Sequence, residues 1–451
     1  MRWTKVAKVL GDLACVHVGY LVAFLIRFQG RLPEVNFTAY LSVVPYLSAA
    51  ALILLHSYGL FSSQRRRWSE VFSSLVCVIA LLLPLSLSIS YLFQTYAFPR
   101  SIFLLAAPVQ LSFLALWRRL VWAWSLSRQG PLTLLVVGPK EEALMRARLI
   151  KNQEPYLFQV AGVVTDVTLD PAAEELAGIS WLGSYTELAA SLEKVGPKAV
   201  LLCSGLPREE RAKILKKAME EELALFLIPD LEDIFLARAS LEQIDGIPVF
   251  RIPRIQEEPA LGWKRLLDIV MGLFFLVPAL PLILLATLAL KLESLRWPVF
   301  YVQERVGRGG RVFRLLKLRT MIPGAEEETG PTLAVPDDPR LTRVGRILRA
   351  TRIDELPQLW NVLKGEMSFV GPRPERPYFV EQLEREIPGY RLRHYLPAGI
   401  TGLAQVEGRY STPPEDKLRY DLMYGKNASL LTDLRIILRT LSVIMLRDKA
   451  S

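Results

Sequence analysis

Long apolar runs alternate with short charged segments through the first third of the chain. Four runs, near residues 6–26, 39–58, 71–93 and 101–124, each approach the twenty residues that a membrane-spanning helix needs. Basic residues gather before the first run, between the second and third, and after the fourth. This bias places the N-terminus and the segment after the fourth run in the cytoplasm. The pattern predicts four transmembrane helices within residues 1–128.

From Leu132 the pattern changes to short β-rich runs that alternate with helical stretches. Buried strands are predicted at 132–138, 160–165, 199–203 and 225–228, with helices between them. Strands alternating with helices are typical of a doubly wound parallel sheet. We therefore expect an α/β, Rossmann-like domain over residues 131–255.

The first turn of this domain reads Gly138-Pro-Lys-Glu-Glu-Ala143. A dinucleotide-binding loop needs Gly-x-Gly-x-x-Gly there, because glycine lets the backbone approach a pyrophosphate closely. Two glutamates at the start of a helix also repel phosphate. A regulatory or oligomerising role is therefore favoured over cofactor binding, and a homodimer is the favoured assembly.

A fifth apolar run, Ile269–Leu290, follows a proline-marked linker. Basic residues flank both of its ends, so the positive-inside rule draws both ends to the cytoplasm. Pro278 and Pro281 lie in mid-run, where they remove helical hydrogen bonds and favour a sharp break. We expect a re-entrant helix–break–helix over residues 264–291, and the alternative is a kinked transmembrane helix.

The polar remainder carries candidate chemistry. A hairpin is predicted over residues 298–321, and an arginine-rich segment then leads to the adjacent acids Asp354 and Glu355. Pro357 suits the first turn of a helix, so the acids should lie at its N-terminus among positive charges. Both features lower the pKa of a carboxyl group and keep it ionised. The alternative is an N-cap with surface salt bridges.

Five cations in separate motifs accompany the acid pair: Lys317, Arg349, Arg352, Arg373 and Arg409. This is more positive charge than two carboxylates need, and it suits a diphosphate substrate. Mg²⁺ would complete such a site, because carboxylate and phosphate oxygens are its preferred ligands.

Composition narrows the class of partner. The chain is 51% hydrophobic and has a formal net charge of +10. Beside long apolar runs, basic excess indicates anionic lipid headgroups or phosphorylated substrates, and no nucleic-acid recognition motif is present. The three cysteines have no metal-ligand spacing, so no zinc-type site can be built from them.

The stretch from Lys264 to about Leu446 resembles the monotopic phosphoglycosyl transferase family, the bacterial sugar transferases that start glycan assembly on undecaprenyl phosphate. The similarity rests on five motifs: Lys264-Arg-x-x-Asp268, Lys317-x-Arg-Thr-Met321, Asp354-Glu-Leu-x-Gln-Leu-x-Asn361, Leu363–Pro374 and Pro397–Arg409. One departure concerns the re-entrant break, which is Ser-Pro in many members and Leu280-Pro281 here. The four spans and the degenerate nucleotide fold are similar to the long form of the family.

The resemblance implies an α/β catalytic domain over residues 262–451, anchored by the re-entrant helix. It implies that Asp354 is the nucleophile and that Glu355 is the Mg²⁺ ligand. The expected substrate- and phosphate-binding residues are Lys317, Arg319, Arg349, Arg352, Arg373, Gln405 and Arg409.

The implied reaction is a ping-pong transfer of hexose-1-phosphate from a UDP-sugar to undecaprenyl phosphate, with release of UMP. It would occur at the cytoplasmic face of the bacterial inner membrane, as the first membrane step of polysaccharide assembly. UDP-glucose and UDP-galactose are the first donors to consider.

Two other classes remain open. A membrane-bound nucleotide-sugar dehydratase or epimerase can share this layout, but it needs a glycine-rich cofactor loop and a Tyr-x-x-x-Lys pair, and neither is found. A non-catalytic scaffold of a polysaccharide assembly complex would release no UMP from UDP-sugars.

Overall fold

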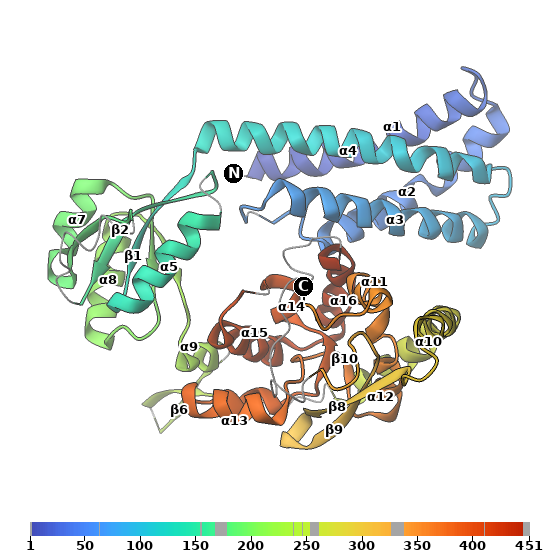
Figure 1. Ribbon diagram of the computed structural model, residues 1–451. Helices are drawn as coiled ribbons and strands as arrows, with labels where there is room; N and C mark the ends of the chain where they lie inside the picture. The colour runs from blue at the N-terminus through green and yellow to red at the C-terminus, as the bar shows by residue number, and fades with distance from the viewer. Residues whose placement is uncertain are drawn as a thin grey trace. The chain divides into compact units, whose positions relative to one another are not determined.

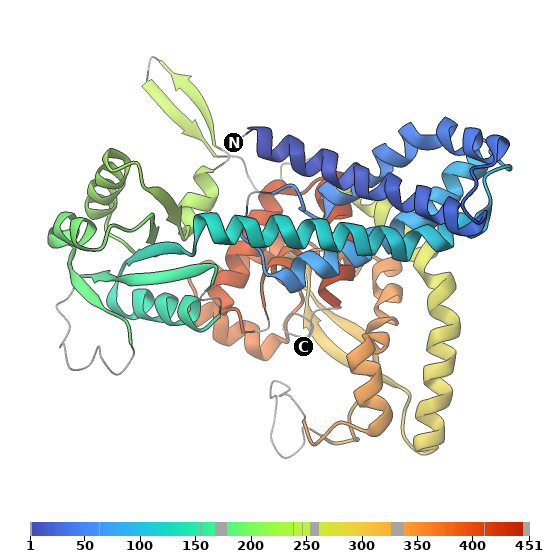
Figure 2. The ribbon, with the colours of Figure 1, turned by 90° about the horizontal axis from the view of Figure 1, so that it is seen from above.

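The structure, a computed structural model, describes residues 2–62, 64–153, 156–166, 178–237, 239–245, 247–252, 261–325, 338–409 and 411–444. The chain forms two compact units, Met1–Asp233 and Ile234–Ser451 (Figures 1 and 2). The sequence suggested three domains, and that finer division stays a prediction.

Four long helices open the first unit: α1 Arg2–Arg27, α2 Glu34–Ser57, α3 Trp68–Leu92 and α4 Arg100–Gln129. Each is long and apolar enough to cross a membrane, as the four apolar runs predicted. Helix α1 packs against α4, α4 against α3, and α3 against α2. A buried ion pair joins α1 and α4, because Arg118 Nε on α4 donates to Asp12 Oδ1 on α1 at 2.8 Å.

A parallel sheet follows in the same unit. Its strands are β1 Leu132–Val137, β2 Phe158–Thr165, β3 Trp181–Ser184, β4 Ala199–Leu202 and β5 Ala224–Leu227, and its helices include α5 Lys140–Gln153, α7 Leu188–Val195 and α8 Arg208–Glu220. The strand order is β3-β2-β1-β4-β5 and every pairing is parallel. The sheet and four of its strands were predicted. The fifth, β3, was missed because its four residues lack a strong apolar run.

The second unit begins within α9 (Leu231–Leu236) and continues into an antiparallel hairpin, β6 Ser240–Ile244 and β7 Ile247–Arg251. The sequence had assigned these strands' residues to the Rossmann-like domain. Helix α10 then runs from Leu261 to Glu293. It is continuous across Pro278 and Pro281, so the expected division into two helices is wrong. Each proline removes one N–H from the helix but does not end it. The re-entrant path stays a prediction.

The remaining elements of the unit follow α10 in the sequence. They are β8 Phe300–Val306, η2 Arg308–Gly310, β9 Val312–Leu318, α11 Arg343–Thr351, η3 Ile353–Glu355, α12 Gln358–Lys364, β10 Ser368–Val370, α13 Pro377–Glu386, η4 Tyr390–Tyr395, β11 Gly399–Thr401, α14 Leu403–Glu407, α15 Pro414–Asn427 and α16 Leu430–Ile444. Strands β8 and β9 form the predicted hairpin. Helix α16 is the last element of the described residues.

Both ends of α10 are fastened to this one unit. Near its start, Asp268 Oδ1 accepts hydrogen bonds from Ser368 Oγ and from the Phe369 amide, each at 2.9 Å. At its end, Glu293 Oε1 accepts from the Val344 amide at 3.0 Å. Between them, Ala279 is 3% exposed and packs in the main apolar core of the unit. One face of α10 therefore lies against the polar domain along most of its length.

The opposite face of α10 is apolar and exposed. The residues recur every three or four positions, which is one side of a helix. They are Leu266, Val270, Leu273, Val277, Leu280, Leu284 and Leu288, each at least 55% exposed. A continuous apolar face of this kind, on a helix whose other face packs against the domain, is typical of a lipid-contacting surface.

Candidate active site

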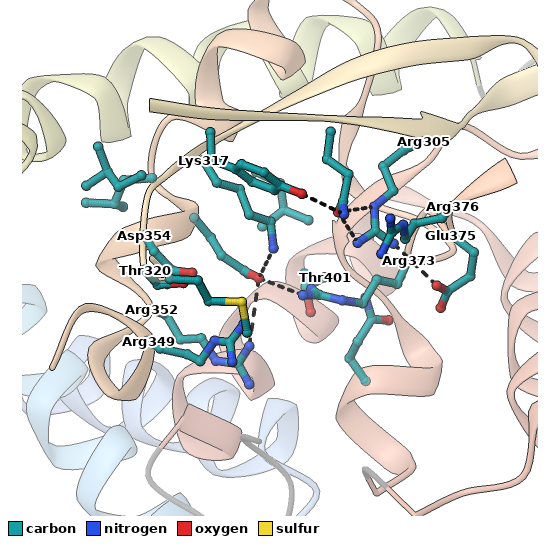
Figure 3. Close-up of a pocket in the computed structure, with 18 of the residues that line it drawn as sticks. Arg305, Lys317, Thr320, Arg349, Arg352, Asp354, Arg373, Glu375, Arg376 and Thr401 are labelled. Atoms are coloured by element: carbon teal, nitrogen blue, oxygen red, sulfur yellow. Dashed lines mark hydrogen bonds and ion pairs between the residues drawn. The ribbon is translucent and has the colours of Figure 1, made fainter. Parts of the chain in front are cut away.

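A cavity of about 1630 Å³ lies within the second unit. The structure brings all the polar residues that the sequence selected to its wall: Lys317, Arg319, Arg349, Arg352, Asp354, Glu355, Arg373, Gln405 and Arg409. Pro278 also lines the cavity, whereas Pro281 does not. Figure 3 shows Lys317, Arg352 and Arg373 approaching the centre from different elements.

The acid pair occupies a short turn between two helices. Helix α11 ends at Thr351, and Arg352 then adopts a left-handed conformation with φ of 60°. A non-glycine residue disfavours this conformation, so the turn stores strain beside the acids. Asp354 and Glu355 follow in the single turn η3, and α12 begins at Gln358 with Pro357 as its N-cap. Pro357 thus lies one position before the helical turn expected for it.

Glu355 is the centre of the cationic cluster. Its Oε1 accepts hydrogen bonds from Lys317 Nζ at 3.0 Å and from Arg373 Nη2 at 2.6 Å. Arg352 Nη1 lies 3.8 Å from the same oxygen. Burial by itself would raise the pKa of Glu355, but Arg373, Lys317 and Arg352 together hold that pKa well below its usual range. Glu355 is therefore ionised, as the sequence predicted.

Asp354 behaves differently from its neighbour. Its side chain is buried, and Oδ1 has no hydrogen-bond partner among the residues that the structure describes. Burial, followed by the charge of Glu355, raises the pKa of Asp354 to about 6, against the opposing effect of Lys317 and the nearby arginines. The predicted lowering of this pKa is therefore wrong, because desolvation outweighs the surrounding positive charge.

Asn361 fixes the strand that carries Lys317. The Asn361 Oδ1 atom accepts from the Leu316 amide at 3.1 Å, and Nδ2 donates to the Arg314 carbonyl at 2.7 Å. Its Nδ2 also donates to Glu366 at 2.7 Å. Because these contacts join α12 to the part of β9 just before Lys317, they help to set the distance between the ammonium group and the acid pair.

Arg373 is held in place by a close approach of two backbone segments. A Cβ at Gly371 would lie 2.1 Å from the Pro397 carbonyl oxygen, and one at Gly399 would lie 2.2 Å from the Gly371 amide nitrogen. Only glycine permits this approach at either position. The glycines of the two motifs thus have a structural role, which is to place the Arg373 loop beside the acids.

The other predicted residues make fewer contacts with the acid pair. Arg319 is buried, lies over the Trp297 ring at 4.8 Å and donates from Nε to the Pro298 carbonyl at 2.9 Å. Its remaining nitrogens, and both polar atoms of the Gln405 amide, have no hydrogen-bond partner among the described residues. Arg319 Nη2 lies 3.9 Å from Glu293 Oε2, whereas the unpartnered Gln405 amide is of the kind expected where a ligand supplies the partner.

Several residues of the cavity wall were not predicted. Tyr301, Gln303 and Arg305 line it from alternate positions of β8, and Arg305 Nη1 donates to the Pro374 carbonyl at 3.0 Å. Their period of two along a strand was visible in the sequence. Residues of α13 and η4 also line the cavity, and no local pattern marked these as neighbours of the acid pair.

The acid pair can supply some of the ligands of a Mg²⁺ ion. No group of three or more His, Cys, Asp or Glu side chains with metal-site geometry occurs among the described residues. Mg²⁺ is commonly held by one or two carboxylates together with substrate phosphates. Asp354 Oδ1 has no partner, whereas Glu355 Oε1 is already bound by Lys317 and Arg373. The residues therefore fit a metal ion that also binds the substrate.

Comparisons with known proteins show what this chain is similar to. A family model described as bacterial sugar transferase matches residues 260–447. The chain is 41% identical over 236 residues to a UDP-N-acetylgalactosamine-undecaprenyl-phosphate N-acetylgalactosaminephosphotransferase of Aeromonas hydrophila, covering 47% of this chain and 55% of that protein. It therefore spans little more than half of that relative.

Two further relatives carry a different sugar in their names. A UDP-glucose:undecaprenyl-phosphate glucose-1-phosphate transferase of Escherichia coli is 34% identical over 320 residues, which cover 68% of this chain and 66% of that protein. A protein of the same name from Caulobacter vibrioides is 46% identical over 194 residues, which cover 42% of this chain and 71% of that protein.

Proposed function

The chain belongs to the bacterial sugar transferase family, and on that premise we propose that it transfers a hexose-1-phosphate from a UDP-sugar to undecaprenyl phosphate. The observation that carries the proposal is the buried Asp354 carboxylate, which has an unpartnered oxygen in a cavity lined by Lys317, Arg352 and Arg373. A nucleophile beside several fixed cations suits attack on a diphosphate.

In the first half of the reaction, an oxygen of ionised Asp354 attacks the phosphorus that bears the sugar. A bond forms between that oxygen and phosphorus, the bond from phosphorus to the UMP oxygen breaks, and UMP leaves with the electron pair. Lys317 and Arg373 offset the charge of the diphosphate, without which two anions would repel each other. A pKa of about 6 leaves Asp354 about nine-tenths ionised at pH 7.

In the second half, a phosphate oxygen of the lipid attacks the same phosphorus and the aspartyl bond breaks. The products are a lipid-linked diphosphosugar and a free Asp354 carboxylate. The cavity wall supports an acceptor with a hydrocarbon chain, because Phe275, Ala279 and Leu282 of α10 and Leu441 of α16 contribute apolar surface to it. A bound Mg²⁺ would further neutralise the diphosphate, and Asp354 and Glu355 are the residues that would hold it.

We also propose that α10 enters and leaves the bilayer on the cytoplasmic side, bending at Pro278 and Pro281 while it stays one helix. Asp268 and Glu293 fasten its two ends to the same unit, which supports this path over a crossing. A helix that crossed would need lipid around its middle, where Ala279 is instead packed in the core. The outward leucines of α10 would then lie among lipid chains and hold the cavity near the headgroups of the inner membrane.

For the sheet domain of the first unit we propose a non-catalytic role, with a homodimer as the working assembly. At the carboxyl end of β1, where a doubly wound sheet binds phosphate, Ser204 Oγ donates to the Glu142 carboxylate at 2.6 Å. A carboxylate in this position repels a dinucleotide, which disfavours the dehydratase or epimerase alternative.

The decisive experiment measures UMP release from a panel of UDP-sugars, with and without undecaprenyl phosphate. The proposal predicts lipid-dependent turnover with at least one UDP-hexose or UDP-N-acetylhexosamine. A stoichiometric burst of UMP without lipid would support the covalent intermediate. No UMP release from any member of the panel, in membranes that contain the folded protein, would favour the scaffold alternative instead.

A further inference from the structure

The cavity is larger than the acid pair and its cations require, and its walls differ in chemistry. On one side, α10 and α16 contribute Phe275, Leu282 and Ile437, which are apolar. On another side, the wall comes from α13, β8 and η4 and is aromatic and polar. Figure 1 shows α13 well separated from α10 within the second unit. The two walls therefore suit different parts of the substrates.

Helix α13 turns one face toward the cavity. The lining residues are Phe379, Gln382, Leu383 and Glu386, at positions i, i+3, i+4 and i+7 of the helix. The only α13 residue that is buried in the protein core is Val380, so core packing does not account for the cavity-facing residues. An aromatic ring beside an amide and a carboxylate is a mixed surface that suits a planar polar ring.

The α13 wall is continuous with the phosphate-binding cations. Arg393 Nη2 donates to the Arg373 carbonyl at 3.0 Å, and Arg393 Nη1 donates to the hydroxyl of Tyr390, which lines the cavity. Arg376 lies 5.9 Å from the centre of the Phe379 ring. Figure 3 shows Arg376 and Arg305 grouped beyond Arg373, away from Asp354. A diphosphate bound at Arg373 would thus extend its next group toward Phe379.

We propose that the α13 lobe, defined by Phe379, Gln382, Leu383, Glu386 and Tyr390, binds the pyrimidine nucleoside of the donor. This inference rests on the proposed function, which requires a nucleoside diphosphate. Phe379 provides a face on which the base stacks. The Gln382 amide can both donate to a ring carbonyl and accept from a ring N–H, which are the groups on the edge of uracil.

The lipid is the less suitable occupant of this lobe. Glu381, Glu384 and Glu386 make α13 acidic, which is unfavourable beside anionic headgroups. The outward apolar face of α10 marks the side from which a lipid chain would enter. Helix α13 lies apart from α10 in Figure 1, so the α13 lobe is not on that side. A neutral base tolerates nearby carboxylates, whereas a second phosphate would be repelled.

The test measures binding of UMP and of inorganic pyrophosphate to the full-length protein in detergent. Phe379→Ala should weaken UMP binding about tenfold, as expected for one lost stacking contact, and leave pyrophosphate affinity within about twofold. Tyr395→Ala is the matched control, because Tyr395 is 43% exposed in η4 and does not line the cavity. It should leave UMP affinity within about twofold. In steady-state assays, Phe379→Ala should raise KM for the UDP-sugar with little change in kcat.

Three outcomes would overturn the inference. These are unchanged UMP affinity in Phe379→Ala, an equal loss of pyrophosphate affinity, or a loss confined to the use of the lipid acceptor. Phe379→Leu, which retains apolar volume but removes the ring, should weaken UMP binding similarly if the alanine variant folds poorly. The proposed function fails separately, through absence of UMP release by the unaltered protein, so the two failures are distinguishable.

Discussion

Asp354 and Glu355 are adjacent in one turn, yet their carboxylates have opposite surroundings. Glu355 Oε1 is bound by Lys317 at 3.0 Å and by Arg373 at 2.6 Å. Asp354 Oδ1 is buried without a hydrogen-bond partner among the described residues. The cations thus stabilise the charge of Glu355, and that charge in turn opposes ionisation of Asp354. One acid organises the site while the other is left reactive.

Asp354→Asn should abolish activity and stabilise the fold. UMP release should fall by at least about a thousandfold, because the nucleophile is lost. The folded-state pKa of about 6 lies above the usual 3.8, so ionised Asp354 destabilises the native state at neutral pH, by on the order of 1–3 kcal/mol. The variant should therefore show a higher Tm at pH 7.5 in detergent.

This gain in stability has a defined pH dependence. The cost of ionising Asp354 is fully present above pH 6 and disappears as the pH falls toward 3.8, since the carboxyl group is then protonated in both states. The difference in Tm should shrink accordingly. Glu381→Gln, which removes an exposed charge outside the cavity, should change neither Tm nor UMP release. Near-normal turnover by Asp354→Asn would refute its assignment as nucleophile.

The rate of UMP release should depend on the ionisation of Asp354. In a single turnover without lipid, the rate should rise about tenfold per pH unit below pH 6 and level off above about pH 7, because only the carboxylate attacks. Rapid-quench measurements between pH 5 and 8 give this profile. A rate that is constant from pH 5 to 7 would show that a group with a different pKa limits the step.

Glu355→Gln should alter the pH profile as well as the rate. Removing the charge of Glu355 lowers the pKa of Asp354, so the acidic limb of the profile should move to lower pH. The plateau should fall by roughly a hundredfold or more, because Lys317 and Arg373 lose the anion that positions them. If the limb stays at its original pH, the electrostatic coupling between the two acids is absent.

Much of this site could be predicted because its motifs are local in sequence. The acid pair, Lys317 and Arg373 each lie within a short segment whose residue types suit diphosphate chemistry, and the structure brings them together. The β8–β9 hairpin followed from its alternation and its glycine turn. Such features need no knowledge of distant packing.

Other properties depend on contacts between distant segments and were not predicted. Burial of Asp354 in the folded unit raises its pKa by more than the nearby positive charges lower it. The left-handed conformation of Arg352 has no glycine or asparagine to indicate it. Phe379 lines the same cavity as the acid pair only because η4 and the Arg373 loop place α13 there.

Asn361→Ala should destabilise the catalytic unit. The substitution removes three hydrogen bonds and leaves the Leu316 amide and the Arg314 carbonyl without their partner, at a cost of about 2–4 kcal/mol. Thermal unfolding in detergent measures this effect, and kcat should fall because Lys317 is no longer fixed. Asn427→Ala is the matched control, since it removes one exposed contact to the Met423 carbonyl. Equal Tm values for the two variants would contradict the structural role of Asn361.

The position of α10 relative to the bilayer can be tested by labelling at its two ends. In a background without Cys15, Cys77 and Cys203, single cysteines replace Gly262 at the start of the helix and Leu295 just after it, both of which are exposed. Because Asp268 and Glu293 attach both ends to one unit, each cysteine should react with a membrane-impermeant maleimide only from the cytoplasmic side.

A cysteine at Val277 serves as the internal control for the same helix. The Val277 side chain is 72% exposed on the protein surface, so a cysteine there should resist the maleimide only when lipid covers it. The expected pattern is two reactive ends on one side and a protected middle. Labelling of Leu295→Cys from the periplasmic side would mean that α10 crosses the bilayer. Asp354 would then lie on the side of the membrane that lacks nucleotide sugars, and the proposed reaction could not occur there.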